Sequence, residues 1–270
     1  MTTANRQSAT PRSKAMKKTP PKARKPRAAR AAASAAPRPA KRGRFHAFEP
    51  ALLAFLGELE ENNEREWFNA NKHRYESDVL QPAMAFIEAM GPPLEAISPH
   101  FLALAQKSGG SLMRIHRDVR FSNDKRPYKT NVGIQFRHTF GKDVHAPGFY
   151  VHLEPGVVFV GAGMWRPDPE PLAKIRDAIA TQPERWAAIC SDRAFYDDWE
   201  LGGDSLKRPP RGYPADHPHV EDLKRRDFIA ARNLTAREIY RRGLPDRLAA
   251  SFAATRHFMA FLCEAVGVPF

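Results

Sequence analysis

The sequence predicts an α+β protein: a central antiparallel sheet, built as a meander, flanked by N-terminal and C-terminal helices and preceded by a disordered basic tail. Apolar residues recur at helical spacing before residue 91 and again after Pro167. Between them lie short alternating or apolar stretches rich in Val, Ile, Phe and Tyr, which is typical of strands. Short connections between these stretches favour an antiparallel meander over parallel crossovers.

The first 44 residues differ in composition from the rest of the chain. They hold 14 of the 43 Lys and Arg residues, none of the 30 Asp and Glu residues, and no Leu, Ile, Val, Phe, Tyr or Trp. Such a segment cannot bury enough apolar surface to fold, so we expect residues 1–44 to be disordered and residues 45–270 to form one domain. A flexible polycation would bind nucleic acid through its phosphates without reading sequence; the alternative is a solubilising extension without a partner.

The predicted helices of the N-terminal third follow one another closely. Residues 50–61 carry leucines and a phenylalanine on one side, and Asn63 with Glu66 forms a capping-box pattern that starts a helix ending near residue 79. A third helix is expected from residue 82 to residue 90, where Gly-Pro-Pro should end it.

Strands are predicted in the middle of the chain, at residues 112–116, 132–138, 148–154 and 157–164. The sequence Glu154-Pro155-Gly156 fits a type II turn, so the last two should form an antiparallel hairpin. Helical patterns return at residues 168–181, 183–190, 220–225, 235–242 and 245–266, with a short strand near residues 227–231.

Residues 111–131 form the most polar stretch of the domain. Strand alternation places Met113 and Ile115 on the core face and Arg114 and His116 on the other. The same alternation puts Tyr150, His152 and Glu154 on that polar face, which would make a cleft for a phosphate- or carboxylate-bearing ligand. The alternative is a solvated sheet face whose aspartates pair with neighbouring arginines.

The candidate residues divide by role. We expect His116 or His152 to move protons near neutral pH, with Asp118 orienting a histidine or an arginine. Arg166 follows two glycines at a strand end and points toward the same ligand. The predicted ligand-binding residues are Arg114, Arg117, Arg120, Asp124, Lys125, Tyr128, Lys129, Tyr150 and Arg166. Two alternatives stay open: a hydrolase-like enzyme that acts on a phosphorylated small molecule, and a protein-interaction module.

Several classes of function are excluded or disfavoured. Residues 45–270 hold 29 basic and 30 acidic residues, so the domain is not a uniformly basic nucleic-acid coat. Its longest uncharged apolar stretch is about half the ~20 residues of a membrane span. The two cysteines are far apart in sequence and suggest neither a disulfide nor a zinc site, and the chain has no dinucleotide or phosphate-binding loop. We therefore predict a cytoplasmic protein with no metal and no cofactor.

Three motif blocks resemble a known family. They are Asn62-Asn63-Glu64-Arg65-Glu66-Trp67-Phe68, the run from Arg114 to Ser122 continued to Lys129, and Gly148-Phe149-Tyr150-Val151-His152 with the following Gly161-Ala162-Gly163 and Trp165-Arg166-Pro167. Over about residues 48–270 the chain resembles the bacterial and fungal family catalogued as domain of unknown function 2461. The resemblance implies no activity, substrate or cofactor, and it leaves the tail uncovered.

Overall fold

One antiparallel sheet organises the computed structural model, which describes residues 45–141 and 146–270. Within these residues the sheet has five strands in the order β1–β2–β3–β5–β4. Their bounds are β1 (Val132–Arg137), β2 (Gly148–Glu154), β3 (Val157–Met164), β4 (Glu200–Gly202) and β5 (Phe228–Leu234). The first three strands form the predicted meander, and β5 then pairs with β3 and carries β4 on its outer edge.

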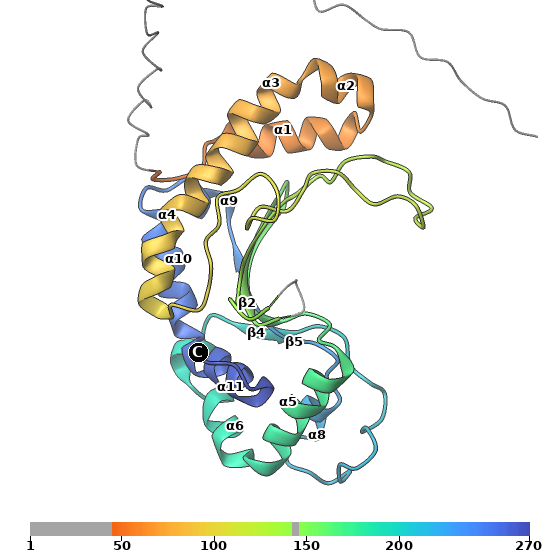
Figure 1. Ribbon diagram of the computed structural model, residues 1–270, viewed down its shortest axis with the longest axis vertical. Coiled ribbons are helices and arrows are strands. Elements are labelled where there is room, and N and C mark those ends of the chain that lie inside the picture. Colours follow the sequence, from red (N-terminus) through yellow and green to blue (C-terminus); the bar gives the residue numbers. More distant parts are fainter. Residues whose placement is uncertain (1–44, 142–145) are drawn as a thin grey trace, which may run out of the picture. The chain divides into compact units, whose positions relative to one another are not determined.

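Helices precede and follow the meander, as predicted, and confirm the α+β class (Figure 1). The N-terminal helices are α1 (Pro50–Glu61), α2 (Arg65–Ala70), α3 (Lys72–Arg74), the π-helical turn η1 (Tyr75–Leu80) and α4 (Gln81–Ile97). The later helices are α5 (Pro169–Thr181), α6 (Pro183–Cys190), α7 (Arg193–Tyr196), α8 (Val220–Leu223), α9 (Ala236–Ile239), α10 (Leu244–Ala254) and α11 (Arg256–Val266). Among the described residues, no helix has the length and apolarity needed to cross a membrane.

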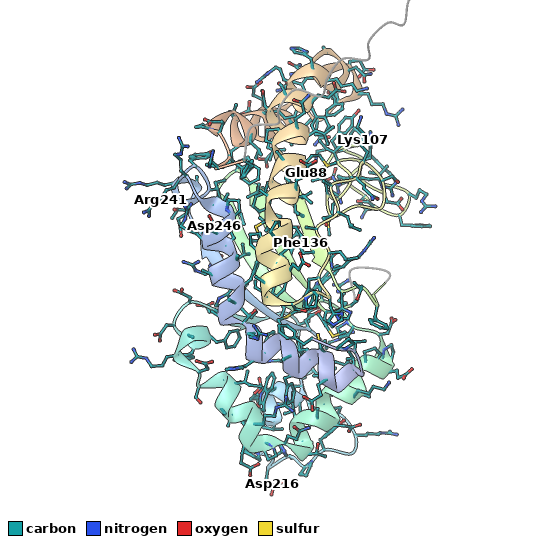
Figure 2. All side chains as sticks on the ribbon, turned by 60° about the vertical axis from the view of Figure 1, so that its left-hand side comes forward. Glu88, Lys107, Phe136, Asp216, Arg241 and Asp246 are labelled. Atoms are coloured by element: carbon teal, nitrogen blue, oxygen red, sulfur yellow. The ribbon has the colours of Figure 1, made fainter. Side chains whose placement is uncertain are left out.

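The strand alternation separates a core face from a half-buried polar face. Ile134 and Phe136 of β1 are fully buried, whereas Gln135 between them is partly exposed. Phe136 lies against Phe86 of α4, with the ring centroids 6.3 Å apart, and Figure 2 shows its position behind that helix. Helix α10 lies beside α4 in both views. The core face of the sheet is therefore covered by helices from both ends of the chain.

The predicted end of the third helix at residue 90 is wrong. Helix α4 continues through Pro92 and Pro93 to Ile97. Each proline removes one backbone N–H donor, but the buried stripe of Met90, Leu94 and Ile97 continues past them. Packing of that stripe therefore outweighs the local preference of the prolines.

The long C-terminal helix predicted for residues 245–266 is two helices. They meet at Thr255, which is fully buried and whose hydroxyl donates to the carbonyl of Phe252 at 2.8 Å. This local bond offers the backbone an alternative to the helical pattern, which explains the break.

The predicted strand at residues 112–116 is wrong in extent, and at Met113 it is also wrong in phase, whereas Ile115 packs against the core and Arg114 and His116 are exposed as predicted. It makes only isolated bridges, at Leu112 to Ile134 and at His116 to Tyr128. Since Leu112 lies opposite Ile134, it shares the core face, and Met113 belongs to the polar face. The sulfur of Met113 lies beside Gly133 of β1, 3.0 Å from the position that a Cβ would take at that residue. The disordered tail predicted for residues 1–44 lies outside the described residues.

Candidate functional site

The polar segment predicted to form a cleft is a hairpin, which we call the basic hairpin (residues 114–130). Its two arms pair where the amide of Lys129 donates to the carbonyl of Ile115 at 2.7 Å and that of Arg117 donates to Pro127 at 2.9 Å. Figure 1 shows the hairpin in yellow-green beside α1 and α2. Its backbone is thus held by short pairing and not by the main sheet.

Asn63 anchors the base of the basic hairpin. Its side-chain amide donates to the carbonyl of Tyr128 and accepts from the N–H of Tyr128, both at 3.0 Å. The Tyr128 ring is 5% exposed and stacks on Phe68 at 4.1 Å. The capping box predicted for Asn63 is therefore wrong, because Glu64 is the N-cap of α2 and the Asn63 side chain is used across the fold. Tyr128, predicted to bind ligand, packs in the core.

Three arginines of the basic hairpin are bonded to its two aspartates. Asp118 accepts two hydrogen bonds from Arg120, the shorter of 2.6 Å. Asp124 accepts from Arg117 at 2.6 Å and from the guanidinium of Arg126. The hydrogen bonds from Arg120 lower the pKa of Asp118 to about 2, and those from the Arg126 and Arg117 side chains place the pKa of Asp124 well below its usual range.

Two cations of the basic hairpin stand apart from this network. Lys129 is partly buried, and burial followed by the positive charge of Arg114 lowers its pKa. Within the described residues, the side chains of Arg114 and Lys129 form no hydrogen bond and no ion pair within 4 Å. Lys125 instead donates to the carbonyl of Val119 at 3.0 Å. The pair of Arg114 and Lys129 is therefore the part of the hairpin with unused positive charge.

A chain of hydrogen-bonding side chains follows the polar face of β2. The Tyr150 hydroxyl lies 3.1 Å from Nδ1 of His152, and Nε2 of His152 lies 3.1 Å from a carboxylate oxygen of Glu154. Thr130 donates to the other Glu154 oxygen at 2.9 Å, and the Phe159 ring stacks on His152 at 4.6 Å. The ring of His152 is thus fixed on three sides.

The neighbours of His152 favour one tautomer. A carboxylate only accepts, so Glu154 favours a proton on Nε2, and Nδ1 is left as an acceptor for Tyr150 or for the amide of Asn131 at 3.5 Å. Burial, and then the charge of Glu154, raises the pKa of Tyr150 to about 12. Tyr150 is accordingly a neutral hydrogen-bond donor to His152, and Glu154 orients the imidazole; we call these three side chains the β2 relay.

The predicted residues lie on different elements of the structure, although Thr130 joins the base of the basic hairpin to Glu154 of the relay. His116 is exposed and pairs with Tyr128 in the basic hairpin. Tyr128 precedes Asn131, which contacts His152, by three residues, or about 10 Å of extended chain. Arg166 is farther from His152. The strand partner of His152 is Phe159, and Arg166 follows Phe159 by seven residues, or roughly 20 Å of extended chain. The candidates therefore divide among the basic hairpin, the β2 relay and the corner that holds Arg166.

Some side chains that shape these places were not predicted. Asn131 and Thr130 reach the relay because the chain bends after the hairpin, and no periodic pattern indicates this. Asp227, which binds the backbone of Arg166, precedes β5 without any distinguishing motif. Glu154 is the exception, since strand alternation alone places it beside His152.

Two further histidines, His217 and His219, make local contacts in the loop before α8. His217 accepts from the N–H of His219 at 3.0 Å, and His219 lies 3.0 Å from the carbonyl of Pro183. Residues 45–141 and 146–270 contain no group of three or more His, Cys, Asp or Glu side chains placed to hold a metal ion.

Fold and site together define an α+β protein with one antiparallel sheet, a buttressed basic hairpin and a histidine relay. Residues 51–261 match the family described as "Conserved hypothetical protein (DUF2461)", so the chain belongs to this family, as its motifs indicate. No curated protein and no solved structure matches the chain. The family description names no activity, so function has to be argued from the geometry.

Proposed function

We propose that the domain binds a phosphate- or carboxylate-bearing small molecule at the base of the basic hairpin, through Arg114 and Lys129. The observation that carries the proposal is the proximity of two like charges, neither of which has a carboxylate oxygen within 4 Å among the described residues. An anion between them would offset both the burial of Lys129 and its repulsion by Arg114. Charge-assisted hydrogen bonds to phosphate or carboxylate are the stronger kind, which makes these ligands the best match.

The remaining predicted ligand residues have a supporting role in this proposal. Arg117 and Asp124 tie the two arms of the hairpin, and Lys125 closes its outer turn. Arg120 binds Asp118 on the exposed side. They preorganise the backbone from which Arg114 and Lys129 extend, which reduces the ordering cost of ligand binding.

A binding experiment with matched variants tests the proposal. Thermal unfolding of the full chain is followed with a panel of phosphate monoesters and carboxylates. Arg114→Met and Lys129→Met should lose the ligand-induced rise in melting temperature, while Arg120→Met, on the same hairpin, should keep most of it. Equal losses in all three variants, or no loss in the first two, would refute the assignment.

A hydrolase-like activity is the second candidate, favoured by the relay of Tyr150, His152 and Glu154. A histidine held by a carboxylate on Nε2, with Nδ1 accepting from the Tyr150 hydroxyl, is suited to passing a proton to or from a phosphorylated compound through that hydroxyl. His152→Gln should then abolish phosphate release and leave ligand affinity nearly unchanged. Ligand binding without turnover in the unaltered protein would leave the domain as a binding module.

Nucleic-acid association through residues 1–44 is a separate proposal, and it depends on the 14 Lys and Arg residues counted there. Full-length protein should bind duplex DNA or RNA weakly and without sequence preference, with log K falling by about 0.9 per log unit of salt for each B-DNA phosphate engaged. A full-length variant with those 14 residues changed to glutamine should lose the binding. Undiminished binding by the variant would place recognition in the folded domain.

A further inference from the structure

A pocket of about 470 Å³ lies at the corner between the end of β3 and the start of α5. Its lining residues are Arg166, Pro167, Pro169, Leu172, Arg176, Asp204, Arg226 and Asp227, and we call it the arginine pocket. It is formed by three segments that are distant in sequence, which meet beside the loop before β5. It contains neither the basic hairpin nor the β2 relay.

The backbone of the arginine pocket is held in an unfavourable conformation. Arg166 has a φ of 46°, in the left-handed region that residues other than glycine rarely adopt. Its N–H donates to one oxygen of Asp227 at 2.6 Å, and the N–H of Asp204 donates to the other at 2.8 Å. Gly203 has a φ of 95°, and a Cβ there would stand 2.4 Å from the Cβ of Asp227. The strained corner is thus fixed around one buried carboxylate.

That carboxylate does not neutralise the arginines of the pocket. Asp227 is 2% exposed, and both of its oxygens are occupied by backbone N–H groups. The guanidiniums of Arg166, Arg176 and Arg226 have no carboxylate oxygen within 4 Å in the described part of the chain. With Asp204 and Asp227 counted, the lining keeps a net charge of +1.

Arg176 has unused hydrogen-bonding capacity at the wall of the pocket. One of its terminal nitrogens donates to the carbonyl of Arg225 at 2.7 Å, and its Nε is buried without a hydrogen-bond partner in the described part of the chain. Buried polar atoms are nearly always paired, so this guanidinium is less well satisfied than most buried groups. Burial, opposed in part by Tyr213 and reinforced by the charge of Arg226, lowers the pKa of Arg176.

We propose that the arginine pocket binds a small organic phosphate as a second anion site of the domain. The three guanidiniums that line the pocket suit the three terminal oxygens of a phosphate monoester, whereas a carboxylate is satisfied by one arginine fork. Pro167, Pro169 and Leu172 supply an apolar wall for the carbon part of the ligand. The N-terminus of α5 is not expected to hold the anion instead, because Pro169 and Pro171 lack the backbone N–H groups that would bind it there.

Calorimetric titration of the full chain with phenyl phosphate at pH 8, where the probe is a dianion, tests this proposal. Benzoate serves as the carboxylate probe of similar shape. Phenyl phosphate should bind more tightly than benzoate, and Arg176→Met and Arg226→Met should each weaken it by at least about tenfold. Arg237→Met, an exposed arginine on α9, should leave affinity unchanged.

Circular dichroism verifies that the variants fold, and Arg226 is exposed, so its replacement does not disturb the core. Lys129→Met separates this site from the hairpin site, because binding that depends on Arg226 should persist in it. Loss in Lys129→Met together with retention in Arg226→Met would overturn the proposal and favour the hairpin alone. Absence of phenyl phosphate binding, or equal affinity for benzoate, would overturn it as well.

Discussion

Replacing Asn63 by alanine should destabilise the domain and loosen the basic hairpin. Asn63 is 8% exposed and makes two hydrogen bonds of 3.0 Å to the backbone of Tyr128. Each bond contributes about 1 kcal/mol net, and the two backbone groups left buried add about 1 to 3 kcal/mol, so we expect a loss of about 3 to 5 kcal/mol. For a domain of this size that lowers the melting temperature by roughly 6 to 20 °C.

The neighbouring residue provides a matched control. Asn62 is exposed and its amide donates only to the carbonyl of Glu58, four residues earlier, at 2.9 Å. Urea unfolding followed by tryptophan fluorescence should give Asn62→Ala a free energy of unfolding within about 0.5 kcal/mol of the unaltered protein. Glu66→Ala should be equally mild, because Glu66 does not form the capping box that its spacing predicts. Equal effects of Asn63→Ala and Asn62→Ala would refute the anchoring role.

Three further predictions concern titrating groups. The pKa values of Tyr150 and Tyr213 are raised to about 12, in both mainly by burial, so the folded state keeps these protons above the unfolded value near 10. Stability should therefore fall as the pH rises from about 10 to 12, and urea unfolding of Tyr150→Phe should show a shallower fall; an unchanged slope would contradict this. In Arg120→Ala the pKa of Asp118 should rise from about 2 toward its ordinary value near 4, as measured by NMR titration. Burial raises the pKa of Cys263 to about 12, so native protein at pH 8 should resist thiol labelling at Cys263 until it is unfolded; rapid stoichiometric labelling would count against its burial.

The sheet could be predicted from sequence because its pattern is local. Strands β2 and β3 begin and end at the predicted residues, and Gly156 adopts the φ of 80° that the predicted type II turn requires. The segment at residues 112–116 failed because it bridges β1 at a single residue pair, so its phase is set by that long-range contact and not by its own alternation. Helix α4 shows the same limit, since its buried stripe carries it past two prolines.

The site was predictable in composition but not in geometry. Polar residue content located the basic hairpin, and alternation located His152 beside Tyr150 and Glu154. Whether an arginine of the basic hairpin forms an ion pair depends on which aspartate lies near it in the fold, and the spacing of these residues in the sequence does not determine that. The separation of Arg166 from His152 follows from the length and pairing of β3, which only the register of the sheet reveals.

The near-neutral charge of residues 45–270 does not argue against anion binding, because the fold determines where its carboxylates are used. In the basic hairpin, Asp118 and Asp124 are bonded to the outer arginines, which leaves Arg114 and Lys129 without partners among the described residues. In the arginine pocket, both oxygens of Asp227 bind backbone N–H groups, so the acid stabilises the strained loop and forms no ion pair with the guanidiniums. At both places acidic groups hold the backbone or bind outlying cations, and positive charge remains that no carboxylate oxygen contacts within 4 Å in the described residues. The net charge of residues 45–270 adds all of these charges to nearly zero, whereas a bound phosphate interacts mainly with the charges that lie within a few ångströms of it.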